Sequence, residues 1–101
     1  MNKTELIAAV AVAAGTTNRD AESVLNSFRD VIQASIRGGD DVSYPGLGKF
    51  SQAARKARTA RNPRTGETLN VKASKVPRFA AAAEFKRIVN GEAPAPKLPK
   101  R

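Results

Sequence analysis

The chain has 101 residues, which suit one domain, and it carries 18 lysines and arginines against 9 aspartates and glutamates, for a net charge of +9. It contains no cysteine and no histidine, which excludes disulfides and thiolate metal sites and removes the commonest acid–base group. With one tyrosine and four phenylalanines, the core of a single chain is small, and we expect a second subunit to enlarge it.

Two helices are predicted before residue 40. Each begins at a side chain that can cap it, followed three residues later by an acid, as in a capping box. These pairs are Asn2 with Glu5 and Thr17 with Asp20. Apolar residues recur at helical spacing until Gly15 ends the first helix and Gly38 and Gly39 end the second. The short link predicts that the two helices pack as a hairpin.

Residues 40–52 read DDVSYPGLGKFSQ, with short alternating apolar runs. Pro45, Gly46 and Gly48 interrupt these runs, which predicts a strand, a bend and a second strand. The glycines on either side of Leu47 fit a tight turn where two backbones approach closely.

A long β-hairpin is predicted next, with strands over about 52–61 and 67–73 joined by NPRTG at 62–66. Asn62 suits the first position of a turn, Pro63 presets the φ of the second, and Gly66 can adopt a positive φ where the hairpin closes. The hairpin has few apolar side chains, and a lone two-stranded ribbon is marginal in water. We therefore expect this arm to be mobile until it binds a partner.

The end of the chain contains a further helix and a tail. Residues 80–90, AAAAEFKRIVN, predict a short helix that Gly91 ends. Residues 91–101 alternate proline with alanine and lysine, which is typical of an extended, disordered tail. The sequence thus predicts an α+β fold.

Positive charge is concentrated in the second half of the chain. Residues 1–48 contain four basic and six acidic side chains, whereas residues 49–90 contain eleven basic and two acidic ones. This asymmetry favours a polyanionic partner, either nucleic acid or an anionic membrane surface. No apolar run approaches the ~20 residues of a membrane span, and we expect a soluble, intracellular protein.

The residues support binding better than catalysis. Paired carboxylates, metal clusters and serine–histidine pairs are missing from the pattern, so we expect neither an enzyme nor a cofactor or small-molecule substrate. A two-stranded ribbon can lie in a groove of duplex DNA while its arginines reach phosphates. Four arginines at residues 55, 58, 61 and 64 are three residues apart, a spacing that alternates faces on a strand and suits a ribbon held between two phosphate walls.

Several segments together resemble one family over residues 1–90. They are MNKTELI at 1–7, GLGKF at 46–50, Arg55, Arg58, Ala60, NPRTG at 62–66, Val76, Pro77, Phe79, Phe85, Lys86, Val89 and Asn90. This set is similar to the signature of the bacterial histone-like DNA-bending proteins, the HU/IHF family, and closest to HU. The resemblance implies an intertwined homodimer in the bacterial nucleoid, whose β-ribbon arms, over about 53–75, enter the minor groove of double-stranded DNA.

The resemblance also implies that Pro63 at each arm tip wedges between base pairs, and that Phe50 and Phe79 pack beneath the arms. On the charge pattern and the resemblance together, the expected DNA-binding residues are Pro63, Arg55, Arg58, Arg61, Asn62, Arg64, Lys3, Lys72, Lys75 and Lys86. Residues 80–83 lack the proline and glycine frequent in the family, which should let the last helix begin more readily.

Three alternatives to a bender with little sequence preference remain open. One is a sequence-selective bender of the IHF kind, because such proteins select through DNA deformability. Another is a protein that binds an anionic membrane or an acidic partner. Such proteins use a basic amphipathic helix, whereas the basic residues of this chain are concentrated on the predicted ribbon. The third is an RNA-binding protein, although the arm lacks aromatic side chains for base stacking.

Overall fold

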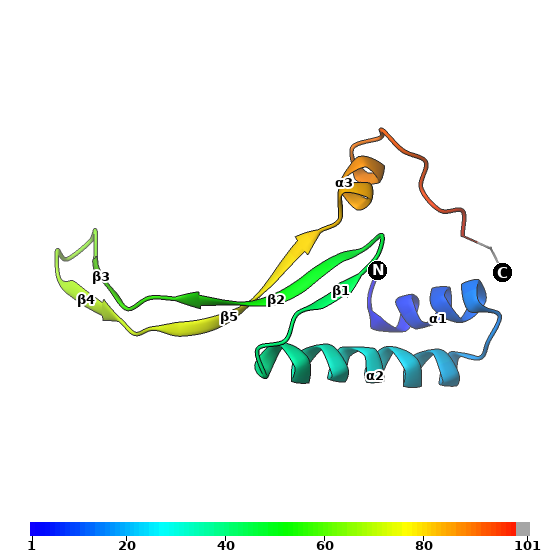
Figure 1. Ribbon diagram of the computed structural model, residues 1–101, viewed down its shortest axis with the longest axis horizontal. Coiled ribbons are helices and arrows are strands. Elements are labelled where there is room, and N and C mark those ends of the chain that lie inside the picture. Colours follow the sequence, from blue (N-terminus) through cyan, green and yellow to red (C-terminus); the bar gives the residue numbers. More distant parts are fainter. Residues whose placement is uncertain (99–101) are drawn as a thin grey trace.

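The computed structural model describes residues 1–98, which form three helices and five strands (Figure 1). In chain order these are α1 (Lys3–Ala14), α2 (Asn18–Arg37), β1 (Val42–Tyr44), β2 (Gly48–Arg55), β3 (Arg58–Arg61), β4 (Thr68–Val71), β5 (Ser74–Ala81) and α3 (Ala83–Val89). The body holds the helices, β1 and the ends of β2 and β5 beside β1, whereas the rest of β2 and β5 extends from the body as the stem of an arm that ends in the β3–β4 ribbon (Figure 1). The predicted α+β architecture is confirmed.

Both predicted helix caps are present. The side chain of Asn2 accepts a hydrogen bond from the backbone N of Glu5 at 2.9 Å, and that of Thr17 accepts one from the N of Asp20 at 3.1 Å. These bonds satisfy backbone donors that have no partner within the helix. At the other end of α1, Gly15 has the left-handed conformation, with φ 70°, which glycine adopts without a steric cost.

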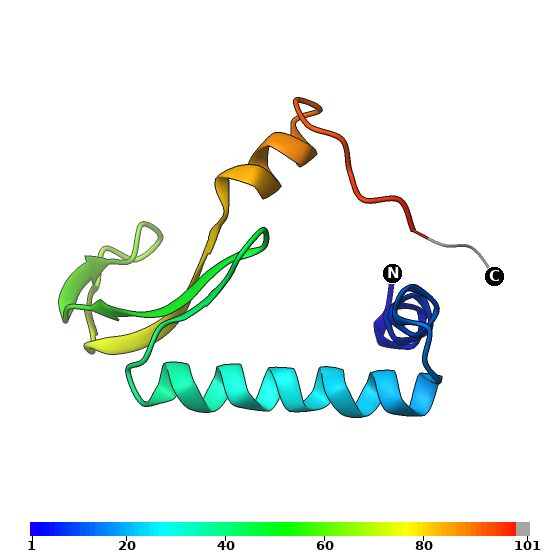
Figure 2. The same cartoon turned by 45° about the vertical axis from the view of Figure 1, so that its right-hand side comes forward.

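Helices α1 and α2 pack through small and branched side chains. Ile7 and Ala11 of α1 and Ala21 of α2 are buried, and Val10 and Leu25 pack against them. Figure 2 shows α1 almost end-on while α2 runs along the page, so the two helices of the predicted hairpin cross at a wide angle. No helix within residues 1–98 has the length and hydropathy needed to cross a membrane.

The sheet of the body has the antiparallel order β1-β2-β5. A turn joins β1 to β2, in which the N of Leu47 donates to the O of Tyr44 at 3.1 Å and Gly46 has φ 84°. After the turn, Gly48 lies so close to β5 that a Cβ atom would meet the O of Ala80 at 2.4 Å. The predicted tight turn with close backbone approach is confirmed.

The predicted long hairpin, with strands over about 52–61 and 67–73, is present in one register, but a short interruption divides its ladder into two parts. Strand β2 pairs with β5 as a stem, and β3 pairs with β4 as a separate two-stranded tip. Between them, Lys56 and Ala57 on one side and Lys72 and Ala73 on the other belong to no strand. Alanines and like-charged lysines offer little cross-strand packing to maintain the ladder at this point.

The last helix is shorter than the predicted 80–90. Ala80 and Ala81 belong to β5, where they pair with Lys49 and Gly48, and α3 begins at Ala83. Alanine is a strong helix former, but pairing with β2 outweighs this local preference. The backbone N of Ala82 donates to the O of Leu47 at 3.0 Å, which holds the chain at the point where the strand ends.

Much apolar surface is left uncovered in the single chain. Val24, Phe28 and Val31 on α2 are 67%, 39% and 61% exposed, and Phe79 on β5 is 45% exposed. A hollow of about 740 Å³ lies between the second half of α2 and strands β2 and β5. Large apolar side chains line this hollow, including Ile32, Ile36, Phe50 and Phe79.

Candidate nucleic-acid interface

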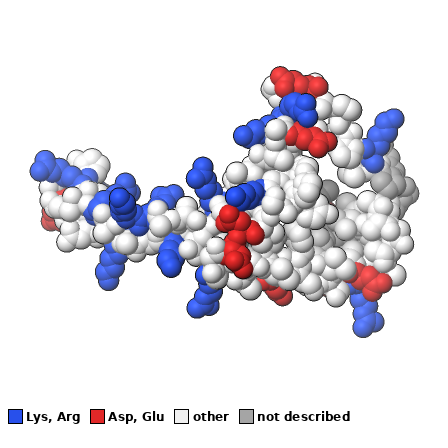
Figure 3. All heavy atoms as spheres, in the orientation of Figure 1, with Lys and Arg blue, Asp and Glu red and all other residues white. Residues whose placement is uncertain are grey.

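Exposed cations cover the arm from stem to tip. Residues 53–75 contain seven basic side chains and one acid, Glu67. The basic residues, all exposed, are Arg55, Lys56, Arg58, Arg61, Arg64, Lys72 and Lys75. In the space-filling view, lysine and arginine follow the whole length of the arm, whereas acidic side chains gather mainly on the body (Figure 3). A polyanion would therefore be attracted to the arm.

The cations of the arm have no acidic partner among residues 1–98. The ion pairs of this part of the chain join Arg29 to Asp30 and Lys49 to Asp41, at 3.0 and 3.1 Å, and both lie outside the arm. The positive potential of the arm is therefore not neutralised internally, and its side chains are available to phosphates.

The tip of the arm is a five-residue loop held by hydrogen bonds from its ends. The O of Asn62 accepts from the N of Gly66, and the N of Asn62 donates to the O of Glu67, each at 2.8 Å. The side-chain Oδ1 of Asn62 also accepts from the N of Arg64 at 2.9 Å, and Gly66 has φ 73°. The predicted roles of Asn62 and Gly66 in the turn are confirmed, and Pro63 is left exposed at the tip.

The register of the tip places its arginines on opposite faces. Arg58 pairs with Val71 and Arg61 pairs with Thr68. Because side chains alternate along a strand, Arg58 lies on the face of Leu69 and Val71, and Arg61 lies on the other. The predicted alternation is confirmed for these two arginines, which share strand β3.

The predicted lysines are distributed among different elements. Lys72 lies in the interruption and Lys75 in the stem, but Lys3 begins α1 and Lys86 lies in α3. Both helices are on the body, away from the tip (Figure 1). All four side chains are exposed, but the single chain does not bring Lys3 or Lys86 onto the arm.

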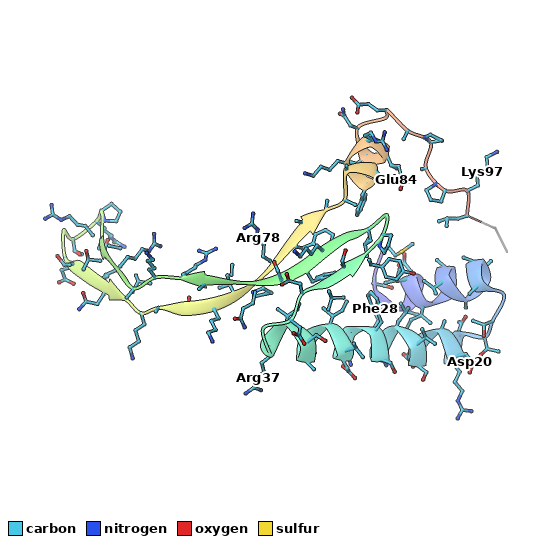
Figure 4. All side chains as sticks on the ribbon, viewed as in Figure 1. Asp20, Phe28, Arg37, Arg78, Glu84 and Lys97 are labelled. Atoms are coloured by element: carbon cyan, nitrogen blue, oxygen red, sulfur yellow. The ribbon has the colours of Figure 1, made fainter. Side chains whose placement is uncertain are left out.

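Sequence reasoning missed one cation on the stem, Arg78. In β5 it pairs with Ser51, whereas its neighbour Phe79 pairs with Phe50, and the rings of Phe50 and Phe79 lie 4.9 Å apart. The side chain of Arg78 points away from α2 (Figure 4). By the alternation of the strand it shares the outer face with Arg55. The signal was present in the sequence, because a residue next to a core phenylalanine on a strand faces outward.

Comparison with known proteins gives a consistent result. Residues 1–90 match the family described as bacterial DNA-binding protein. Over 89 residues the chain is 43% identical to the DNA-binding protein HU of Pasteurella multocida, covering 88% of this chain and 99% of that protein. Over 92 residues it is 42% identical to the DNA-binding protein HU 1 of Bacillus subtilis, covering 91% of this chain and all of that protein.

A solved structure is similar as well. The protein of an Anabaena HU–DNA cocrystal structure superimposes with a TM-score of 0.82 at 40% identity, covering 94% of this chain and all of that one. Proteins of this kind are non-enzymatic, DNA-binding architectural proteins. With the fold, the arm and these relatives in agreement, the chain belongs to the bacterial DNA-binding protein family, in its HU branch.

Proposed function

We propose that this protein binds and bends double-stranded DNA with little sequence preference, acting in the bacterial nucleoid. The observation that carries the proposal is the arm, on which exposed cations without an acidic partner in residues 1–98 cover a narrow ribbon. Affinity from such a surface comes mainly from neutralising phosphates and releasing counterions, and it depends little on base sequence.

The proposed binding mode places the arm in the minor groove. With Arg58 and Arg61 on opposite faces of β3, a ribbon in a groove can reach the phosphates of both strands at once. Arg55, Arg64 and Lys72 would extend these contacts towards the stem and the tip. Lys3 and Lys86 would contact DNA that passes over the body, and Lys75 would contact DNA beside the stem. Asn62 holds the loop at the tip.

Pro63 is the proposed wedge. It is exposed in a loop whose ends are held by hydrogen bonds, and an apolar ring at such a point can enter a base step and unstack it. Architectural proteins that bind the minor groove, HU and IHF among them, use wedges of this kind to kink DNA.

A homodimer is the proposed functional unit. The exposed apolar side chains of α2 and β5 and the hollow of about 740 Å³ between them would be covered by a second copy. Residues 1–90 would form this DNA-binding unit. Residues 91–98 contain no helix or strand, and disorder of the tail remains a prediction; residues 99–101 of that tail lie outside the described residues.

A gel-shift titration tests the proposal. The purified protein is titrated against unrelated duplexes of equal length and against one nicked copy, at low and high salt. We expect similar affinity for all intact sequences, tighter binding to the nicked duplex, which is easier to bend, and a steep loss of affinity with salt. One sequence bound far more tightly than the others would favour the sequence-selective alternative, and no binding at low salt would exclude both.

A further inference from the structure

The side chain of Gln52 joins the stem of the arm to the end of helix α2. Its Nε2 atom donates a hydrogen bond to the backbone O of Ile36 at 3.0 Å and a longer one, at 3.4 Å, to the O of Arg37. Both carbonyl groups are in the last turn of the helix, where carbonyls lack partners within the helix itself, and the O of Ile36 also accepts a hydrogen bond from the N of Gly39 at 3.1 Å. Figure 4 labels Arg37 at this end of α2, beside the root of the arm.

Gln52 pairs with Pro77 across the β2–β5 ladder. The backbone O of Leu47 accepts a hydrogen bond from the N of Ala82, and hydrogen-bonded pairs recur at every second position of an antiparallel ladder. The backbone groups of Gln52 and Pro77 therefore point away from each other, so the ladder loses no bond at the proline, which has no N–H group to donate. The side chain of Gln52 links this position of the stem to α2.

Apolar packing within the chain leaves room between the stem and the helix. Gln52 and Phe50 belong to the same face of β2, because side chains alternate along the strand, and both line the hollow of about 740 Å³ against α2. Gln52 is itself only partly exposed. Within one chain, the hydrogen bond gives the stem a contact of defined direction with the end of α2, beside the apolar surface that the proposed second copy would cover.

We propose that Gln52 is a positioning residue, whose amide group fixes the direction in which the arm leaves the body. A fixed stem sets the path that the two arms impose on bound DNA. The step from the direction of the stem to the path of bound DNA rests on the proposed function. The orientation of the stem is a property of the free protein and can be measured without DNA.

The chemistry of the bond suggests a set of variants. Gln52→Leu fills similar space but has no donor. Gln52→Glu keeps the shape, but at neutral pH it cannot donate and it places negative charge at the carbonyl end of a helix. Gln52→Lys keeps a donor and adds a charge that this end of the helix favours. Gln33→Leu makes the same chemical change at an exposed glutamine of α2 that lines the same hollow from the helix side, and it is the matched control.

The experiment measures the distance between the stem and α2. Because the chain has no cysteine, spin labels can be attached to Arg19→Cys on α2 and Ser74→Cys at the end of the stem, both exposed. Ser74 lies on the stem side of the interruption, so motion of the tip does not enter the measurement. Labelled chain is mixed with excess unlabelled chain, so that each labelled chain pairs with an unlabelled one, and pulsed dipolar spectra are recorded without DNA.

We expect the parent protein, Gln33→Leu and Gln52→Lys to give the same narrow distance distribution. Gln52→Leu and Gln52→Glu should broaden it, since losing one hydrogen bond raises the population of displaced stems by roughly 2- to 10-fold. The same two variants should then change the bend angle of bound DNA.

Two results would overturn the inference. The first is a stem–α2 distance distribution in Gln52→Leu as narrow as that of the parent protein. The second is the same distribution in Gln52→Lys and Gln52→Glu, which would show that a hydrogen-bond donor at residue 52 does not affect the stem. If Gln52→Leu fails to fold, the comparison of the distance distributions of Gln52→Lys and Gln52→Glu still tests the proposal. The unaltered protein provides a further measurement, because the side-chain amide protons of Gln52 should exchange with solvent more slowly than those of Gln33. Equal exchange rates would contradict the proposal, whether or not the protein bends DNA.

Discussion

The backbone O of Asn62 accepts a hydrogen bond from the N of Gly66 at 2.8 Å, which closes the loop that carries Pro63 at the end of the arm. The loop is thereby held by its first and last residues, while the ring of the proline is left exposed. Presetting the turn and entering a base step are compatible roles for this ring. Substitution of Pro63 can separate them.

Pro63→Ala should reduce DNA bending more than it reduces affinity. The side chain of alanine is too small to separate two base pairs, whereas the cations that provide affinity are unchanged. Bending is measured by energy transfer between dyes at the ends of a duplex at saturating protein, and affinity by titration. Pro94→Ala, a change after α3, is the matched control. Equal bending by Pro63→Ala and the parent protein would exclude the wedge.

Arg58→Ala and Arg61→Ala should each reduce the dependence of affinity on salt. Removing one phosphate contact lowers the slope of log K against log salt by about 0.9, and removing it from both arms of a homodimer lowers the slope by about 1.8. The slopes are measured by titration at a series of salt concentrations. Arg29→Ala provides the control, because Arg29 is paired with Asp30 on α2. An unchanged slope in an arm variant would show that its arginine touches no phosphate.

Gly48→Ala should destabilise the protein, because the added Cβ atom would lie 2.4 Å from the O of Ala80 and 2.8 Å from the ring of Phe79. We expect a loss of about 1–3 kcal/mol in the free energy of unfolding, measured by urea denaturation at fixed protein concentration. In Gly38→Ala the new atom would lie 3.6 Å from its nearest neighbours. This control should be neutral or more stable by about 0.4–1 kcal/mol. Equal stability of the two variants would contradict the close approach of β2 and β5.

The midpoint of thermal unfolding should rise with protein concentration. A second copy that covers the exposed apolar side chains of α2 and β5 stabilises the folded state by mass action. The midpoint is followed by circular dichroism over a wide concentration range, with sedimentation at each end of the range to report the mass. A concentration-independent midpoint with the mass of one chain would contradict the homodimer.

Local chemistry made parts of this structure predictable. The caps Asn2 and Thr17 act on residues three positions away, and the turn between Asn62 and Gly66 is determined by the residues within it. In each case the interacting groups are close in sequence, so that residue preferences alone identify the interaction.

Features that depend on distant pairing were not predictable. The interruption at Lys56 depends on which residues face it across the ribbon, and the strand conformation of Ala80 depends on pairing with Lys49. Gln52 reaches a carbonyl 16 residues away, and no local pattern marks such an interaction. For the interface, composition identified the arm and strand alternation predicted opposite faces for Arg58 and Arg61, but the residues that share each face with them were known only from the register.

The most direct test of the central claim is the end-to-end distance of a dye-labelled, intact duplex with and without saturating protein at low salt. If the protein bends DNA with little sequence preference, the distance should shorten by a similar amount for several unrelated sequences. Retardation of the same duplexes in a gel, with an end-to-end distance that stays at the value of free DNA, would show that the protein binds DNA without bending it and would contradict the account.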